Sequence, residues 1–177
     1  MRQGRMVMII HSEALNLQRT TVQDLAFVLA IEQSELNRIY IGQWSKEEHT
    51  TALQDPDIPH LTIWESIGKR VGYIIVTGLQ ETHLAVCIKR IVIHSKGFGY
   101  GKLSLRLVTD WIFRHTETHR LWLDVREHNH KARHVYESCG FTPEGTLRDC
   151  IKVGERFESL HIMSILRHEY MERTERQ

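Results

Sequence analysis

The chain has 177 residues, of which 41% are apolar and 25% are charged, and its formal net charge is +1. This length suits one compact domain, and the composition excludes a disordered chain, a collagen-like chain and a disulfide-packed miniprotein. The balance of 23 basic and 22 acidic residues gives no general attraction to nucleic acid or to a membrane surface, so neither is expected as a partner.

The N-terminal ten residues contain Arg2, Arg5 and then the apolar run 6–10, which is too short for a signal-peptide core. We expect this segment to be a leading strand or a frayed end. No stretch approaches the roughly 18 apolar residues that a membrane span needs. The three cysteines form no CxxC pair and cannot all pair with one another. These features predict a cytoplasmic protein with reduced thiols.

The first half of the chain predicts a strand, two helices and then a run of strands. Alternating residues predict a strand over 15–19, and Thr20 or Thr21 can cap a helix that extends to about Gln33. The run Ser45-Lys-Glu-Glu48 is a capping-box pattern and predicts a helix over 45–53. Further strands are expected over 60–65, 70–77 and about 83–93, with a turn at 66–69.

The second half has a more regular pattern. A glycine-rich turn over 96–101 precedes a helix in which Leu103, Leu107 and Trp111 recur every four positions. A strand is expected over 121–125, followed by a helix that Asn129 caps and Gly140 ends. Two closing strands, over 141–151 and 160–166, flank a turn at Gly154. We expect one domain, 1–177, with a core of 15–166 and a charged, peripheral tail over 167–177.

The turn Lys96-Gly-Phe-Gly-Tyr-Gly101-Lys102 is the most informative local pattern. Glycines allow successive amide N–H groups to point into one concavity, and the start of the following helix adds partial positive charge. Lys96 and Lys102 would strengthen both effects. The turn is therefore suited to a phosphate or a pyrophosphate.

Several phosphate motifs compete for this turn. A Walker loop needs four residues between its first glycine and its Gly-Lys pair, and Ser or Thr directly after that pair. The chain meets neither condition. A dinucleotide fingerprint, GxGxxG, is missed by one residue, although Asp124 follows at about the distance of its acidic partner. The spacing Lys96-x-x-Gly99-x-Gly101 resembles the pyrophosphate loop of the GNAT acyltransferases, Q/R-x-x-G-x-G/A. A glycine turn that binds nothing is the remaining alternative.

A second motif favours the GNAT family. The segment Asn129-x-x-Ala132-x-x-x-Tyr136-x-x-x-Gly140-Phe141 resembles the family's N-x-x-A-x-x-x-Y-x-x-x-G-F pattern at every fixed position. The run from Glu144 to Asp149 and the run from Ile162 to Leu166 look like the closing strands of its Rim-type branch, which acetylates ribosomal-protein N-termini, polyamines and small amines. The resemblance spans about 15–166 and is weak before Ile88.

The resemblance implies a fold, a co-substrate and a set of binding residues. It implies an α/β fold with a mixed, centrally splayed sheet flanked by helices, with acetyl-CoA as co-substrate in the splay. It also admits a homodimer, because members of this family often dimerise. Backbone of the strand before the glycine turn would hold the pantetheine arm: Ile91, Val92 and Ile93. The turn would hold the pyrophosphate: Lys96, Gly97, Phe98, Gly99, Tyr100, Gly101 and Lys102. Asn129 and Arg133 would line the co-substrate at the start of the next helix.

By its position in the motif, Tyr136 matches the family's general acid. Acetyl transfer to an amine expels a thiolate, and a phenol can supply the proton that this thiolate takes up. Backbone N–H groups of the splayed strand could polarise the acetyl carbonyl. The alternative role of Tyr136 is a core tyrosine, because it shares a helix face with Val135 and Cys139.

The general base is not evident in the sequence. Many relatives carry Glu in the strand before the loop, but Cys87, Ile88 and Lys89 offer no carboxylate here, and Glu81 is a weak candidate. Direct attack by the neutral fraction of the amine, or a water relay, would also suffice. We expect no metal site, because no carboxylate or cysteine completes the pair His130 and His134.

The predicted function is therefore N-acetyl transfer from acetyl-CoA to a primary amine by direct attack in a ternary complex. The acceptor would be a protein N-terminal α-amine, a polyamine or another small amine. Its specificity is expected to depend on residues 21–57 and 149–158, where Trp44, Asp55, Asp57, Asp149 and Glu155 are candidates. The alternatives are a catalytically silent acyl-CoA-binding module on the same fold and a nucleotide-binding oxidoreductase.

Overall fold

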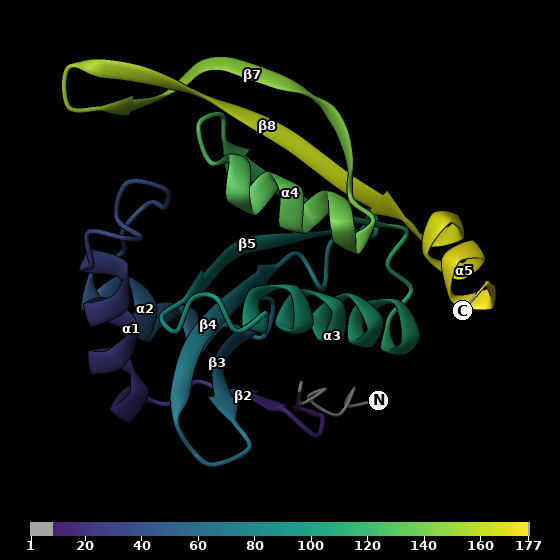
Figure 1. Cartoon of the computed structure of the whole chain (residues 1–177), viewed down its shortest axis with the longest axis horizontal. Helices are drawn as coiled ribbons and strands as arrows, with labels where there is room; N and C mark the ends of the chain where they lie inside the picture. The colour runs from purple at the N-terminus through teal and green to yellow at the C-terminus, as the bar shows by residue number, and fades with distance from the viewer. Residues whose placement is uncertain (1–8, 177) are drawn as a thin grey trace.

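The computed structural model describes residues 9–176, and the strands in this range form one eight-stranded sheet (Figure 1). Its order is β1-β2-β3-β4-β5-β6-β8-β7. The strands are β1 (Ile10–His11), β2 (Leu15–Arg19), β3 (His60–Glu65), β4 (Arg70–Thr77), β5 (Ala85–Ile93), β6 (Arg120–Arg126), β7 (Thr142–Val153) and β8 (Arg156–Leu166). The helices are the 3-10 turn η1 (Val22–Asp24), α1 (Leu25–Gln33), α2 (Lys46–Ala52), α3 (Tyr100–His115), α4 (His130–Cys139) and α5 (Arg167–Glu175).

The sheet opens between its two parallel strands, β5 and β6. Within the described residues these strands pair only at Ala85 with Arg120, Val86 with Leu121 and Cys87 with Trp122. Beyond Cys87, β5 continues beside β4 and β6 continues beside β8. The mixed, splayed sheet predicted from the sequence is confirmed.

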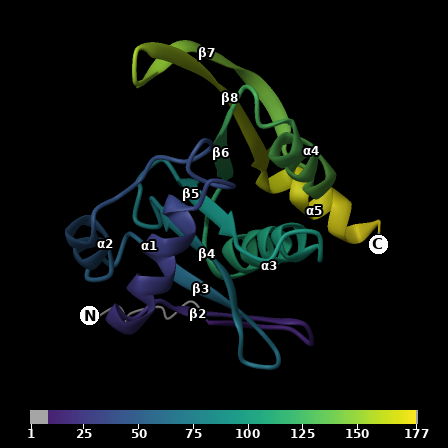
Figure 2. The same cartoon turned by 60° about the vertical axis from the view of Figure 1, so that its left-hand side comes forward.

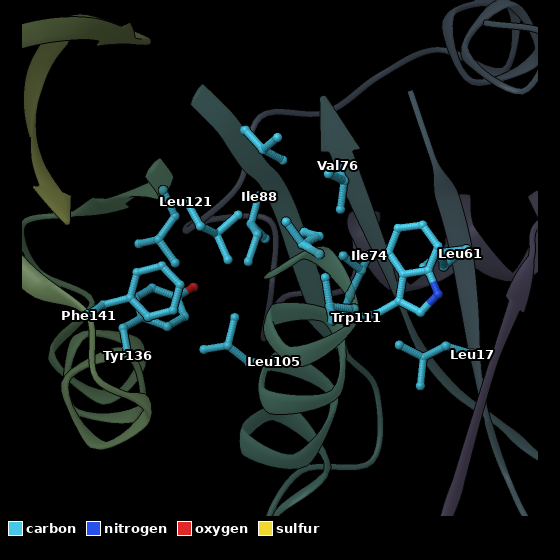
Figure 3. Packing of buried hydrophobic residues seen from close by; sticks show 14 of the residues in the cluster. Leu17, Leu61, Ile74, Val76, Ile88, Leu105, Trp111, Leu121, Tyr136 and Phe141 are labelled. Atoms are coloured by element: carbon cyan, nitrogen blue, oxygen red, sulfur yellow. The ribbon is translucent and has the colours of Figure 1, made fainter. Parts of the chain in front are cut away.

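Two hydrophobic cores lie on opposite faces of the sheet. Figure 2 shows α1 on one side of the strands and α3 on the other. The larger core joins α3 and α4 to the sheet, and Figure 3 shows Leu105 and Trp111 of α3 among buried residues of β2, β3, β4, β5 and β6. The smaller core lies under α1, where Val28 and Ile31 pack on Tyr73, Ile75 and Val92. Helix α3 thus covers one side of the opening, and the α1–α2 region lies on the other.

The local signals in the sequence identify the element ends closely. Ser45 and Glu48 form the expected capping box, with Ser45 Oγ 3.2 Å from Glu48 N. Asn129 Oδ1 accepts the Ala132 N–H at 3.2 Å, and Gly140 ends α4 with φ of +102°. The strand predicted over about 83–93 begins two residues later, at Ala85, because residues 81–84 form a turn in which Leu84 has a φ of +55°.

The C-terminal segment corrects a second expectation. The sequence predicts a peripheral tail, but residues 167–175 form α5, and Tyr170 is 7% exposed and stacks on Phe113 of α3 at 4.7 Å. Arg167 donates hydrogen bonds to the carbonyls of Phe113, Thr116 and Thr118. The charged helix α5 is therefore held against the domain by one buried tyrosine and by the hydrogen bonds of one guanidinium group.

The predicted leading strand falls largely on residues 1–8, which lie outside the described residues, whereas Ile10 pairs with Leu17 in β1. Among the described helices, none combines the length and the apolar character that a membrane crossing requires.

Candidate active site

The opening between β5 and β6 leads into a cavity of about 760 Å³. Its walls come from β5, β6, the glycine turn, the starts of α3 and α4, and the segment 36–44. It therefore connects the α3 face of the sheet to the α1–α2 face, which would allow two substrates to meet between the strands. Of the residues predicted to bind the co-substrate or to act in catalysis, the lining contains Ile91, Val92, Ile93, Lys96, Gly97, Gly99, Tyr100, Gly101, Lys102, Asn129 and Tyr136.

Two of the predicted residues are not among those that line the cavity. Phe98 is 71% exposed and stacks on Tyr100 at 5.6 Å, on the outside of the turn. Arg133 pairs with Glu137 one turn along α4, at 3.0 Å. Contacts of acetyl-CoA with these two side chains therefore stay predictions.

The glycine turn has the backbone of an anion site. Gly97 and Gly99 have φ of +90° and +78°, a left-handed backbone conformation that residues other than glycine rarely adopt. Gly99 caps α3, so the free N–H groups of the first helical turn are directed at the turn. Lys96, Lys102 and Lys131 line the same end of the cavity. Burial, together with the charge of Lys131, lowers the pKa of Lys96. This donor set fits the pyrophosphate of acetyl-CoA.

Tyr136 belongs both to the core and to the cavity. It is 9% exposed, lies beside Phe141 at a centroid distance of 6.4 Å and lines the cavity from α4. In Figure 3 its hydroxyl oxygen lies on the side that faces Leu105 and Ile88. Burial raises the pKa of Tyr136, and the nearby Asp124 carboxyl raises it further. The phenol therefore stays protonated at neutral pH.

Asp124 is the carboxylate that the sequence analysis did not assign to this site. It lies on β6, lines the cavity, and has its pKa raised by burial against the opposing charges of Lys89, Arg126 and Arg90. The alternation Leu121, Leu123, Val125 places these three on the core face, and so directs Asp124 to the opposite face. This alternation is the sequence signal that could have identified Asp124 as a residue of the site.

The candidate base Glu81 does not fit the site, and the Cys87 thiol of β5 cannot replace it. Glu81 is exposed, accepts hydrogen bonds from Thr82 and His83 in a turn before β5, and is not among the cavity lining. Cys87 is 6% exposed, and burial raises the pKa of its thiol to about 12. A thiol with that pKa stays protonated at neutral pH and cannot accept a proton there.

The α1–α2 side of the cavity is formed by Tyr40, Ile41, Trp44 and Arg90. Trp44, a sequence candidate for the acceptor site, stacks under the Arg90 guanidinium at 4.8 Å. Other candidates have structural roles: Asp57 accepts the backbone N–H groups of Gly78 and Gln80, and Asp55 accepts that of Asp57. Asp149 lines a second cavity of about 370 Å³, together with Glu127 and Glu158.

A mixed sheet that splays beside a glycine-capped helix, with a buried tyrosine across the opening, defines an acyl-CoA-dependent acyltransferase site. The model of the Acetyltransferase (GNAT) family matches residues 29–141, and the chain belongs to this family. It is an acetyl-CoA-dependent N-acetyltransferase. The sequence prediction of family and co-substrate is thereby confirmed, while assignment to the Rim-type branch stays a prediction.

The proteins similar to this chain include spermidine acetyltransferases. Spermidine N(1)-acetyltransferase of Vibrio cholerae serotype O1 is 23% identical, covering 91% of this chain and 98% of the relative. The Escherichia coli K12 enzyme of the same name is 22% identical, covering 90% of each chain. The crystal structure of the Vibrio cholerae spermidine N-acetyltransferase with CoA and spermine aligns with a TM-score of 0.81 at 22% identity, over 90% of this chain and 99% of that chain.

Proposed function

We propose that the enzyme transfers the acetyl group of acetyl-CoA to a primary amine of a small polyamine, by direct attack in a ternary complex. The observation that carries this proposal is the placement of Asp124 and Tyr136 on one cavity, which the glycine turn closes at one end and the 36–44 segment borders on the other side of the sheet. A base and an acid then have access to the same reacting centre.

Asp124 is the proposed general base. Its pKa is raised by burial, so its carboxylate takes up a proton more readily than an exposed aspartate would. Its carboxylate would take the proton that the acceptor's ammonium group must lose before the neutral amine can attack. The positive charges of Lys89, Arg126 and Arg90 oppose this shift, because they favour the ionised carboxylate.

Tyr136 is the proposed general acid, which donates its proton to the departing thiolate. Burial keeps the phenol protonated, and the same dry surroundings raise the basicity of a thiolate formed beside it. The amides of β5 beyond Cys87 that point toward the opening would polarise the acetyl carbonyl, because β6 does not pair with them there.

Two observations support a polyamine acceptor. The relatives from Vibrio cholerae and Escherichia coli are named as spermidine N(1)-acetyltransferases. In addition, the two cavities are lined by residues that are adjacent in the sequence. Arg126 and Leu160 line the large cavity, and their neighbours Glu127 and Ser159 line the small one. The carboxylates of Glu127, Asp149 and Glu158 would attract the distal ammonium groups of an acceptor whose first amine lies at Asp124.

The test is thiol release from acetyl-CoA over a panel of amines: spermidine, small diamines, aminoglycosides, and peptides beginning with Ala or Ser. Release with spermidine in the wild type, and its loss in Tyr136→Phe, would support both the acceptor class and the acid. Release only with peptides would overturn the polyamine acceptor. Binding of acetyl-CoA without release on any amine would favour the silent acyl-CoA-binding module.

Two further expectations from the sequence stay predictions. A homodimer would be tested by light scattering of the purified chain at micromolar concentration. A cytoplasmic location would be tested by fractionating cells that express the chain without a tag.

A further inference from the structure

A buried polar network lies between α1 and the sheet, directly behind the cavity wall. Glu32 of α1 is 1% exposed, and its Oε1 accepts a hydrogen bond from Arg90 Nη1 of β5 at 2.5 Å and another from the hydroxyl of Tyr73 on β4. Its Oε2 accepts the backbone N–H of Trp44 at 3.3 Å. One carboxylate thus joins α1, two strands and the segment that borders the cavity.

Two buried histidines connect this carboxylate to the far end of the sheet. His49 Nε2 lies 3.2 Å from Glu32 Oε1, a close approach that is not a well-aligned hydrogen bond. His49 Nδ1 lies 3.0 Å from His60 Nε2, and His60 Nδ1 lies 2.9 Å from Thr20 Oγ1. A continuous line of close polar contacts thus runs from Glu32 through the two imidazole rings to Thr20.

The segment that Glu32 holds has little regular structure of its own. Residues 34–44 form turns, yet they supply a large part of the cavity wall. At one end, Lys96 Nζ donates to the Leu36 carbonyl at 3.0 Å. At the other end the segment depends on Glu32, through the Trp44 amide and through Arg90, whose guanidinium covers the Trp44 ring at 4.8 Å.

Stability alone is a poor explanation for this buried ion pair. Moving a carboxylate and a guanidinium out of water is costly, and a well-packed apolar pair of similar volume is often as stable. What the charges add is a defined orientation, because Arg90 and the Trp44 backbone must each meet a particular oxygen of Glu32.

The part of the cavity wall that Glu32 orients lies on the side where the amine acceptor would bind. The glycine turn and α3 hold the co-substrate side of the opening, whereas Trp44 and Arg90 approach the cavity from the α1–α2 face. We propose that Glu32 is a positioning residue for the amine acceptor, which sets the acceptor-side wall through Arg90 and Trp44. This inference rests on the proposed function, because it assumes that an amine enters from that face.

The test compares Glu32→Gln with the double variant Glu32→Gln/Arg90→Met. The single variant leaves the buried guanidinium without its anion and is expected to lower the melting temperature. The double variant removes both charges, so its melting temperature should return toward that of the wild type. The matched control is Asp24→Asn, because Asp24 precedes the same helix and pairs with Arg70 at 3.2 Å away from the cavity.

We expect both Glu32 variants to raise KM for the amine at least tenfold, with KM for acetyl-CoA within twofold of the wild type. Amide hydrogen exchange of residues 34–44 should also accelerate in both, and Asp24→Asn should change neither quantity. A wild-type amine KM and wild-type exchange in the double variant would overturn the proposal, since the network would then serve stability alone. If the wild type acetylates no amine, the proposed function fails, and the exchange of residues 34–44 decides whether Glu32 holds the wall.

Discussion

The carboxyl group of Asp124 on β6 lies close enough to the Tyr136 phenol on α4 to raise its pKa, and both residues line one cavity. Each is also partly withdrawn from water, so burial favours the neutral phenol and makes the carboxylate more basic. Proton uptake is therefore assigned to the carboxylate of Asp124, and proton donation to the phenol of Tyr136.

Asp124→Asn should lower kcat by about 10²- to 10⁴-fold, the range that a positioned general base contributes. The sign of its pH dependence follows from the raised pKa. In the wild type, activity should fall as the pH drops through the raised pKa of Asp124, because the protonated carboxyl can no longer accept a proton. A pH profile of kcat/KM should lose this acidic limb in the variant and keep the limb that belongs to the amine. An unchanged acidic limb in Asp124→Asn would exclude Asp124 as the base.

Tyr136→Phe should lower kcat by about 10²-fold or more while leaving KM for acetyl-CoA nearly unchanged, since only the proton donor is lost. The ring still fills its place beside Phe141, so the melting temperature should change little. Tyr170→Phe is the control, because Tyr170 is equally buried but lies on α5 against Phe113, outside the cavity lining. Equal losses of kcat in the two variants would contradict a specific role for Tyr136.

The co-substrate half of the site was predictable because its signals are local in the sequence. Left-handed Gly97 and Gly99 and the Asn129 cap each act within one turn of the chain. Their spacing therefore carries the geometry directly, without knowledge of which strands pair.

The acceptor half depends on contacts between distant residues, and the sequence did not predict it. Glu32 and Arg90 are 58 residues apart, and nothing near either one indicates that they share a buried pair. Asp124 was noticed only for its distance from the glycine turn, because its direction into the cavity depends on where β6 diverges from β5. The docked α5 was missed for the same reason, since a single buried tyrosine among charged residues gives little periodic signal.

Gly72→Ala should destabilise the fold by about 2–3 kcal/mol and should also raise KM for acetyl-CoA. A Cβ at this position of β4 would lie 2.3 Å from the Val92 carbonyl oxygen and 3.2 Å from the Ile93 Cα, and backbone cannot move aside as a side chain can. The displaced strand is the one expected to hold the pantetheine arm. Gly145→Ala on β7 is the matched control, because no atom lies within 4 Å of its added Cβ. Chemical denaturation of both variants measures their free energies of unfolding. Equal stability of the two variants would contradict the close approach of the added Cβ to the β5 backbone.

His60 should make the fold sensitive to mild acid. Burial lowers the pKa of His60 to about 3, with a further contribution from His49. Between about pH 6.5 and 3 the unfolded chain therefore binds a proton here that the folded chain does not. The free energy of unfolding should fall by about 1.4 kcal/mol for each pH unit of acidification in this window. Glu32 acts in the same direction at lower pH. Burial raises its pKa, but the close approach of His49, the hydrogen bond from Tyr73 and the charge of Arg90 together lower the pKa overall.

The measurement is urea denaturation of the wild type and His60→Gln at intervals from pH 7 to pH 4. The variant is expected to be less stable at pH 7, because it disturbs the bonds to His49 and Thr20, but its stability should depend less steeply on pH, by about one proton. His83→Gln, at an exposed position before β5, should keep the wild-type slope. Equal slopes of unfolding free energy against pH in the wild type and His60→Gln would show that His60 binds its proton equally in the folded and unfolded chains. The buried histidines would then have no part in acid unfolding.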